Sequence, residues 1–257
     1  EREEVLGGAL ARRAETVHLI LDGAPIDPRR ASERLGYQLA RHHTALVLWA
    51  EPAGGTQGAL ESAATLLAQA AGARTPLTLP AGTSTLWAWL GTGSEPALDA
   101  LREAITKAQP NIRVVVGPAR VGIDGFRRSH DAALTMHRLL SGQRGGDRVA
   151  LYREFEVTTL AARDLDRAAE FVATTLGPLA ADTPGAARLR QTLRVFLEEA
   201  ENAPRTAARL HTHRNTVLQR VTRATELLGH RPGARRLPVE LALELAHHLG
   251  PRLLARD

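Results

Sequence analysis

The 257-residue sequence contains no cysteine, and Lys107 and Met136 are its only lysine and methionine. The absence of cysteine excludes disulfide bonds, thiolate nucleophiles and zinc sites built on cysteine. A Walker-type phosphate loop is also excluded, because its glycines lead into a lysine followed by serine or threonine, whereas Lys107 stands in "ITKAQ". Aromatic residues make up only 4% of the chain, so any core is mainly aliphatic.

Long apolar runs are also missing from the sequence. No stretch approaches the roughly 20 consecutive apolar residues that span a bilayer, and no signal-peptide pattern is present. We therefore expect a cytoplasmic protein of two domains with no membrane segment. The chain begins with Glu1 rather than methionine, which indicates a piece of a longer protein. An upstream sensory domain could then respond to a small-molecule effector.

Positive charge is concentrated toward the C-terminus. The whole chain has 33 basic residues (Lys and Arg) and 28 acidic ones, a net charge of +5. From Ala186 onward the chain has thirteen arginines and only seven acidic residues. The net positive charge therefore lies in the last quarter of the sequence. This asymmetry favours nucleic acid as a partner, because basic side chains neutralise phosphates.

Apolar periodicity and turn residues predict mixed secondary structure in the first two thirds of the chain. Residues 1–37 are predicted to form two helices, the second with Asp27 as its N-cap and Gly36 at its end. Residues 38–178 follow the order strand, helix, strand, strand, helix, strand, helix, strand, and the last strand is "DRVALYREF". A further helix is expected near 164–176. This order indicates an α+β sandwich with helices packed on one sheet.

The Pro-, Gly- and Ala-rich stretch "LGPLAADTPGAA" marks a boundary before residues 186–257, which we expect to be entirely helical. A short helix in "RTAARL", a break at "HTH" and a longer helix ending before Gly229 form the outline of a helix-turn-helix. Thr212 is the expected N-cap of the longer helix. The last helix, "LPVELALELAHHLG", should pack beneath these two through Leu237, Leu241 and Leu245.

The longer helix has an apolar face and an opposite polar face. At about 100° per residue the apolar side chains share one side, namely Val217, Val221, Ala224 and Leu228. The polar face offers amides that bond adenine edges, threonine methyls that contact thymine, and arginines that bind guanine or phosphate. A solvated bundle helix is the alternative, but few acids precede Glu226 on this face. Because such a helix enters the major groove by its N-terminal residues, we expect DNA contacts from Thr212, His213, Arg214, Asn215, Thr216, Gln219, Arg220 and Arg223.

The stretch "LRQTLRVFLEEAENAPRTAARLHTHRNTVLQRVTRATELLG", followed by "LPVELALELAHHL", resembles the C-terminal helix-turn-helix of the PucR/CdaR family of bacterial transcriptional regulators. Residues 213–216 match the "H-R-N-T" core of that family, whereas its "Y-R-L" stands here as Gln219, Arg220 and Val221. The resemblance extends upstream through element order and "RVGIDGFRRSHDAALTMHRLL". It implies that residues 38–178 form a degenerate GGDEF-like α/β sandwich ahead of an all-α DNA-binding domain.

Two other functions stay open: a nucleotide-binding or nucleotide-cyclising enzyme, and an interaction module that does not bind DNA. A cyclase needs carboxylates to hold divalent metal near phosphates, but the hairpin Leu79–Trp87, which should carry "GGDEF", contains no acid. Glu51 after the first strand is a single carboxylate. We therefore expect no catalysis and no cofactor, and a central domain that mediates a homodimer or higher homo-oligomer or transmits a signal.

Histidine pairs do not predict a metal site, because adjacent or i+2 histidines on a helix point to different faces and no third ligand is evident. The pairs are His42–His43, His211–His213 and His247–His248. The neighbours Ser129, His130 and Asp131 lie on one predicted helix, where they cannot arrange themselves as nucleophile, base and orienting acid. We expect these three on the helix surface.

Overall fold

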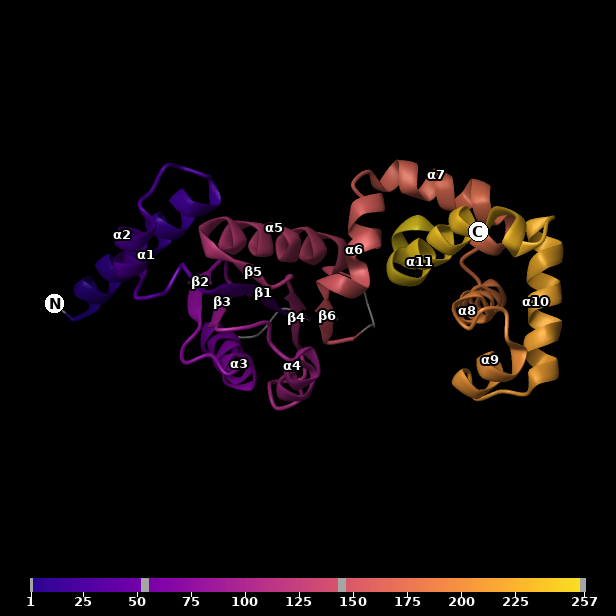
Figure 1. The fold of residues 1–257 in the computed structure, drawn as a ribbon, viewed down its shortest axis with the longest axis horizontal. Coiled ribbons are helices and arrows are strands. Elements are labelled where there is room, and N and C mark those ends of the chain that lie inside the picture. Colours follow the sequence, from indigo (N-terminus) through magenta and orange to yellow (C-terminus); the bar gives the residue numbers. More distant parts are fainter. Residues whose placement is uncertain (1, 52–55, 143–146, 255–257) are drawn as a thin grey trace. The chain divides into compact units, whose positions relative to one another are not determined.

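The structure is a computed structural model that describes residues 2–51, 56–142 and 147–254. It divides into two compact units, residues 1–154 and 155–257 (Figure 1). The first unit combines helices with one sheet, and the described part of the second unit is helical. The predicted α+β class is therefore confirmed.

Two helices open the first unit, as predicted. They are α1 (Arg2–Leu21) and α2 (Pro28–Leu35). The carboxylate of Asp27 accepts a hydrogen bond from the backbone N–H of Arg30 at 2.8 Å, which caps the start of α2. Gly36 ends α2 with a φ of 60°, a left-handed conformation that glycine adopts without steric cost.

The first unit is built on a single mixed sheet. Its strands are β1 (His42–Ala50), β2 (Leu77–Pro80), β3 (Thr85–Thr92), β4 (Ile112–Val116), β5 (Arg120–Val121) and β6 (Val149–Leu151). The spatial order is β2-β3-β1-β4-β6, with β5 paired to β1. Only the β4–β6 pairing is parallel in the described sheet. The predicted hairpin is confirmed as β2 and β3, which pair antiparallel.

Helices cover both faces of this sheet (Figure 1). The helices α3 (Gln57–Ala70) and α4 (Leu98–Ile105) lie on one face, and α5 (Gly122–Leu140) lies along β1 on the other. Leu48 belongs to the apolar core shared with α3 and α4, whereas the backbone N–H of Ala45 donates to α5. All residues of β1 after His42 are buried, as in other strands covered on both faces.

Close packing of α5 corrects the expected surface position of Ser129 and His130. These residues are 0% and 4% exposed, and only Asp131 faces solvent. The hydroxyl of Ser129 accepts the Ala45 N–H at 2.8 Å. A Cβ at Gly117 would lie 2.3 Å from the backbone oxygen of Ser129, so α5 approaches the sheet too closely for a side chain there. The helix therefore uses short and hydrogen-bonding residues as part of its buried face.

The predicted strand "DRVALYREF" is correct only at Val149–Leu151. Strand β6 ends at Leu151, and α6 (Tyr152–Ala161) follows at once. The boundary between the two units falls between residues 154 and 155, within α6 and ahead of the linker predicted after 178. It falls there because α7 (Leu165–Leu176) packs against the last helix of the second unit.

The second unit continues from α7 through six further elements. They are the 3-10 helix η1 (Gly177–Ala180), α8 (Pro184–Glu198), α9 (Ala203–Arg209), α10 (Arg214–Leu228), the 3-10 helix η2 (Pro232–Arg235) and α11 (Arg236–Leu253). The predicted face of α11 is wrong at Leu237, which is 76% exposed, and Leu241 is only partly buried. Leu245 is buried as expected. Because α11 packs against both α7 and α8, its buried face is displaced from Leu237 to Val239, Ala242, Ala246, Leu249 and Leu253.

Candidate nucleic-acid interface

The first helix of the predicted helix-turn-helix is α9. The side chain of Asn202 accepts a hydrogen bond from the N–H of Arg205 at 3.0 Å and caps the start of the helix. A proline stands in the first turn, where no N–H is needed. Thr206 and Ala207 are buried, and α9 packs against both α8 and α10. These small residues allow α10 to cross closely.

A tight turn without glycine joins α9 to α10. The N–H of Thr212 donates to the Ala207 carbonyl at 2.9 Å, and the N–H of His211 donates to the Ala208 carbonyl at 3.3 Å. These two bonds form a Schellman motif, with His211 left-handed at a φ of 48°. The turn therefore holds the start of α10 in a fixed relation to α9.

The N-cap of α10 is His213, which corrects the prediction of Thr212. The Nδ1 atom of His213 accepts a hydrogen bond from the N–H of Asn215 at 3.2 Å. Thr212 stands one residue too early to be the N-cap, because α10 begins at Arg214; its backbone N–H belongs to the Schellman motif. It contributes its backbone to the turn instead.

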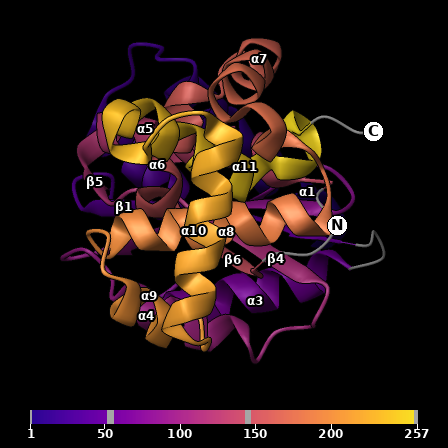
Figure 2. The same ribbon diagram turned by 90° about the vertical axis from the view of Figure 1, so that its right-hand side faces the viewer.

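The inner side of α10 anchors the helix. Val217 and Ala224 are fully buried, and α10 packs against α8 and α9, with its outer side open in Figure 2. Val221 and Leu228, placed on the same face by the sequence, are half-buried. Gly229 ends the helix with a φ of 74°, as predicted.

The outer side of α10 brings three of the eight predicted contact residues, Asn215, Gln219 and Arg223, into one surface, which we call the outer stripe. Its members are exposed: Asn215, Leu218, Gln219, Thr222, Arg223 and Glu226. Arg214 and His213 are exposed at its N-terminal end, and Thr216 and Thr212 are half-buried beside it. Arg220 is not brought into the stripe. Its side chain is half-buried and its Nη1 lies 3.4 Å from the Thr192 hydroxyl of α8.

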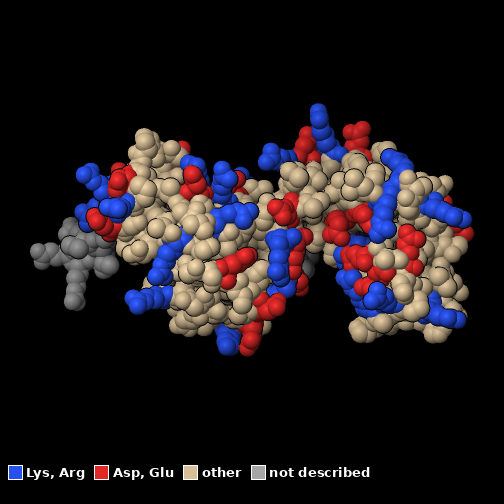
Figure 3. Space-filling view, viewed as in Figure 1, with Lys and Arg blue, Asp and Glu red and all other residues tan. Residues whose placement is uncertain are grey.

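Carboxylates neutralise some of the arginines near α10 and leave others free. Arg209 lies 2.6 Å from Glu198 and 3.2 Å from Glu199, whose charges raise the pKa of its guanidinium. Arg223 pairs with Glu226 at 2.8 Å in solvent. Among the residues that the structure describes, no carboxylate lies within ion-pair distance of Arg205 or Arg214. Figure 3 shows basic side chains along the outer edge of the second unit at α10.

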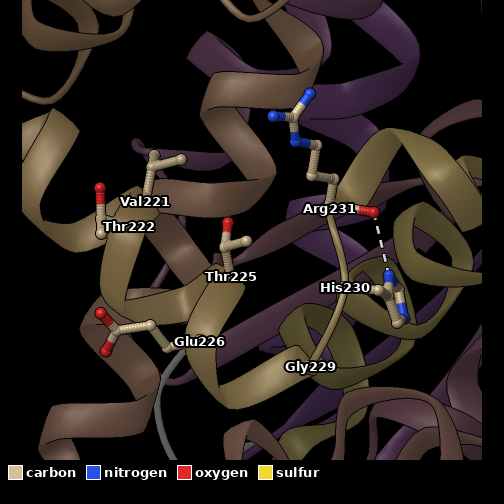
Figure 4. A pocket seen from close by; sticks show the side chains of 7 residues that line it. All are labelled: Val221, Thr222, Thr225, Glu226, Gly229, His230 and Arg231. Carbon is tan, nitrogen blue, oxygen red and sulfur yellow. Dashed lines mark hydrogen bonds between the residues drawn. The ribbon is translucent and has the colours of Figure 1, made fainter.

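A shallow groove of about 770 Å³ runs beside the C-terminal half of α10. Figure 4 shows Thr225 with Thr222 and Glu226 of the outer stripe on one side and His230 and Arg231, which follow the helix, on the other. Arg231 borders the groove and is exposed, and the Nδ1 of His230 bonds the Arg231 carbonyl at 2.9 Å. The sequence reasoning did not single out Arg231 or Leu218. Helical spacing alone could have found Leu218, three residues after Asn215.

Glu51, the carboxylate that follows the first strand, has partners within the first unit. The carboxylate of Glu51 accepts a hydrogen bond from the Trp49 indole at 3.0 Å and lies 3.8 Å from Arg113. Within residues 2–51, 56–142 and 147–254, no three His, Asp or Glu side chains are grouped as metal ligands would be. None of the helices in these ranges combines the length and apolarity that crossing a membrane requires.

A mixed α+β unit is followed by a capped helix-turn-helix, the motif whose second helix enters the DNA major groove in many DNA-binding proteins. Comparison with protein families agrees: residues 22–139 match the GGDEF-like domain, and residues 189–245 match the PucR C-terminal helix-turn-helix domain. The resemblance to PucR/CdaR regulators is thus confirmed. The chain is a DNA-binding transcriptional regulator that carries these two domains.

Comparison with solved structures finds the crystal structure of a regulator of polyketide synthase expression from Bifidobacterium adolescentis. The two sequences are 18% identical, the alignment covers 90% of this chain and 91% of that one, and the TM-score is 0.46. A search of curated proteins found no match.

Proposed function

We propose that this regulator recognises a specific DNA sequence by placing α10 in the major groove. The observation that carries the proposal is the outer stripe: two amides, Asn215 and Gln219, are exposed on the first turns of a helix that buries Val217 and Ala224 on its opposite side. The N-terminal turns of such a helix reach base edges. Because both the preceding turn and the helix start are capped by hydrogen bonds, the amides are held for base contacts rather than on a mobile segment.

The predicted residues take three different roles in this proposal. Asn215 and Gln219 bond base edges, with Thr216 and Thr222 beside them. Arg214 and Arg223, whose ion pair with Glu226 lies in solvent, bind guanine or phosphate. Other groups near α10 join them, namely the exposed Arg205, Arg231 and His213 and the half-buried Thr212. Arg220 instead orients α10 against α8 through Thr192. We therefore do not assign Arg220 a direct DNA contact, because its side chain is half-buried and directed toward α8.

We propose that the GGDEF-like domain has no catalytic activity and mediates homodimerisation or transmits a signal. The acid-free hairpin of β2 and β3 and the paired state of Glu51 support this assignment. The division into residues 1–37, 38–178 and 186–257 stays a prediction, and the packing of α7 on α11 favours including α7 in the DNA-binding part. The proposal places the protein in the cytoplasm, where it reaches DNA.

An electrophoretic shift with fragments of the native upstream region tests the function. We expect a shift that survives excess random DNA and that Asn215→Ala together with Gln219→Ala abolishes. An interaction module would show no shift at all. Turnover of GTP or ATP by the purified protein, abolished by chelating Mg²⁺, would overturn the non-enzymatic assignment of the GGDEF-like domain without affecting the DNA result.

A further inference from the structure

Leu218 is a large apolar side chain in the middle of the outer stripe. It is 48% exposed and lies three residues after Asn215 and four before Thr222, so the three share one side of α10. A single exposed leucine is ordinary on a protein surface. Its position is the informative feature, because any groove that receives the amides of Asn215 and Gln219 also receives Leu218.

The chemistry of the major groove restricts what Leu218 can contact. The apolar feature that a base pair presents there is the C5 methyl group of thymine, and the other groups are hydrogen-bond donors and acceptors. Leucine against those groups would remove their water without replacing the hydrogen bonds, which costs free energy. Leucine against a methyl group buries apolar surface on both sides. The side chain therefore favours thymine and disfavours the other bases.

We propose that Leu218 is a specificity-determining residue that reads the C5 methyl group of a thymine within the operator. This inference rests on the proposed function, in which α10 lies in the major groove. Burial of one methyl group contributes about 0.8 kcal/mol, which corresponds to about fourfold in affinity. The contact thus adds to the hydrogen bonds of the neighbouring amides and selects a base that they do not read.

Replacement of single thymines by deoxyuridine tests this contact, because it removes the methyl group and keeps the base pair. The operator duplex is first located by footprinting on the native upstream region, and each thymine is then replaced in turn. We expect at least one position where the full chain loses about fourfold in affinity. Leu218→Ala should bind the thymine and deoxyuridine duplexes equally, whereas Leu218→Met should retain the preference. Leu237→Ala is the matched control, an exposed leucine on α11.

The outcomes separate this inference from the proposed function. Sequence-specific binding with no loss at any deoxyuridine would overturn the thymine contact and leave the proposed function intact. An undiminished deoxyuridine effect in Leu218→Ala would overturn it equally. Absence of specific binding would overturn both. If Leu218→Ala changed the oligomeric state and not the deoxyuridine preference, the side chain would serve a contact between copies of the chain, contrary to this assignment.

Discussion

Arg209 of α9 lies 2.6 Å from Glu198 at the end of α8, so an ion pair ties the first helix of the helix-turn-helix to the helix before it. A second contact joins the same guanidinium to Glu199 at 3.2 Å. The charge of Arg209 is therefore paired with carboxylates of the protein itself. Arg214, only five residues further on, has no such carboxylate partner among the described residues and remains available for phosphate.

This difference predicts opposite effects of two similar substitutions. Arg209→Gln should lower the free energy of unfolding by about 0.2–1 kcal/mol, the range for partly exposed ion pairs, and leave the salt dependence of DNA binding unchanged. Arg214→Gln should leave stability unchanged and reduce the slope of log affinity against log salt by about 0.9, because one phosphate contact releases about one counterion. Thermal unfolding and a salt series of binding isotherms measure both effects. Equal slopes for the two variants would contradict the assignment.

The burial of α11 predicts a second contrast. Leu245 is 1% exposed and Leu237 is 76% exposed on the same helix. Leu245→Ala should destabilise the second unit by about 2–5 kcal/mol, because it removes buried surface and leaves a cavity. Leu237→Ala should change stability by less than about 0.5 kcal/mol. Denaturant unfolding distinguishes the two, and a large loss for Leu237→Ala would show that the exposed end of α11 is packed.

The left-handed turn predicts a stabilising substitution. His211 has a φ of 48°, which costs a non-glycine residue about 1–2 kcal/mol and costs glycine nothing sterically. Glycine also loses more conformational entropy on folding, which offsets part of this gain. His211→Gly should therefore stabilise the second unit by about 0.5–1 kcal/mol. Ala208→Gly within α9 is the matched control and should destabilise by about 1 kcal/mol. Melting temperatures that move in the same direction for both variants would be incompatible with this turn.

The buried ring of His130 predicts a pH dependence in the first unit. Burial lowers the pKa of His130 from its ordinary 6.5 to about 4, with smaller contributions from His18 and Arg138. Between about pH 4 and pH 6.5, His130 is therefore protonated in the unfolded chain and neutral in the folded chain. Stability should fall by about 3 kcal/mol as the pH falls from about 6.5 to about 4, and the loss is complete below the lower value.

His130→Phe is the variant that tests this dependence. The ring stacks on Trp89 with 5.1 Å between centroids, and its Nε2 atom is buried without a partner, so phenylalanine keeps the contact and removes the proton site. We expect a flatter stability profile for the variant. Burial also lowers the pKa of His43, so a smaller fall in stability remains. An unchanged profile would mean that His130 is accessible to protons in the folded state.

Local signals in the sequence predicted the ends of several helices. Asp27 and Gly36 mark the two ends of α2, and Gly229 ends α10. Helix caps and left-handed glycines act within a few residues, so the sequence alone predicts them. The exposed amides of α10 followed from helical spacing alone. The order of strands and helices in the first unit was also predicted, apart from the short strand β5 and the start of α6, which replaces the end of the predicted strand "DRVALYREF".

The sequence did not predict features that depend on packing or on competition between neighbouring residues. Thr212 has the better capping side chain, yet His213 is the N-cap because α10 begins at Arg214, directly after the Schellman turn. Ser129 and His130 are polar residues on a helix, and only the approach of α5 to the sheet buries them. Arg220 turns toward α8 for the same kind of reason: its partner Thr192 is 28 residues away in the chain.

The most direct test of the account compares the affinity of amide variants for a cognate and a scrambled duplex across a salt series. Asn215→Ala and Gln219→Ala should each lose about 1–3 kcal/mol on the cognate duplex and little on the scrambled one, because a lost base contact matters only where that base is present. Both variants should keep the salt slope of the unmodified chain. Equal losses on the two duplexes, or no loss on either, would show that α10 does not read sequence.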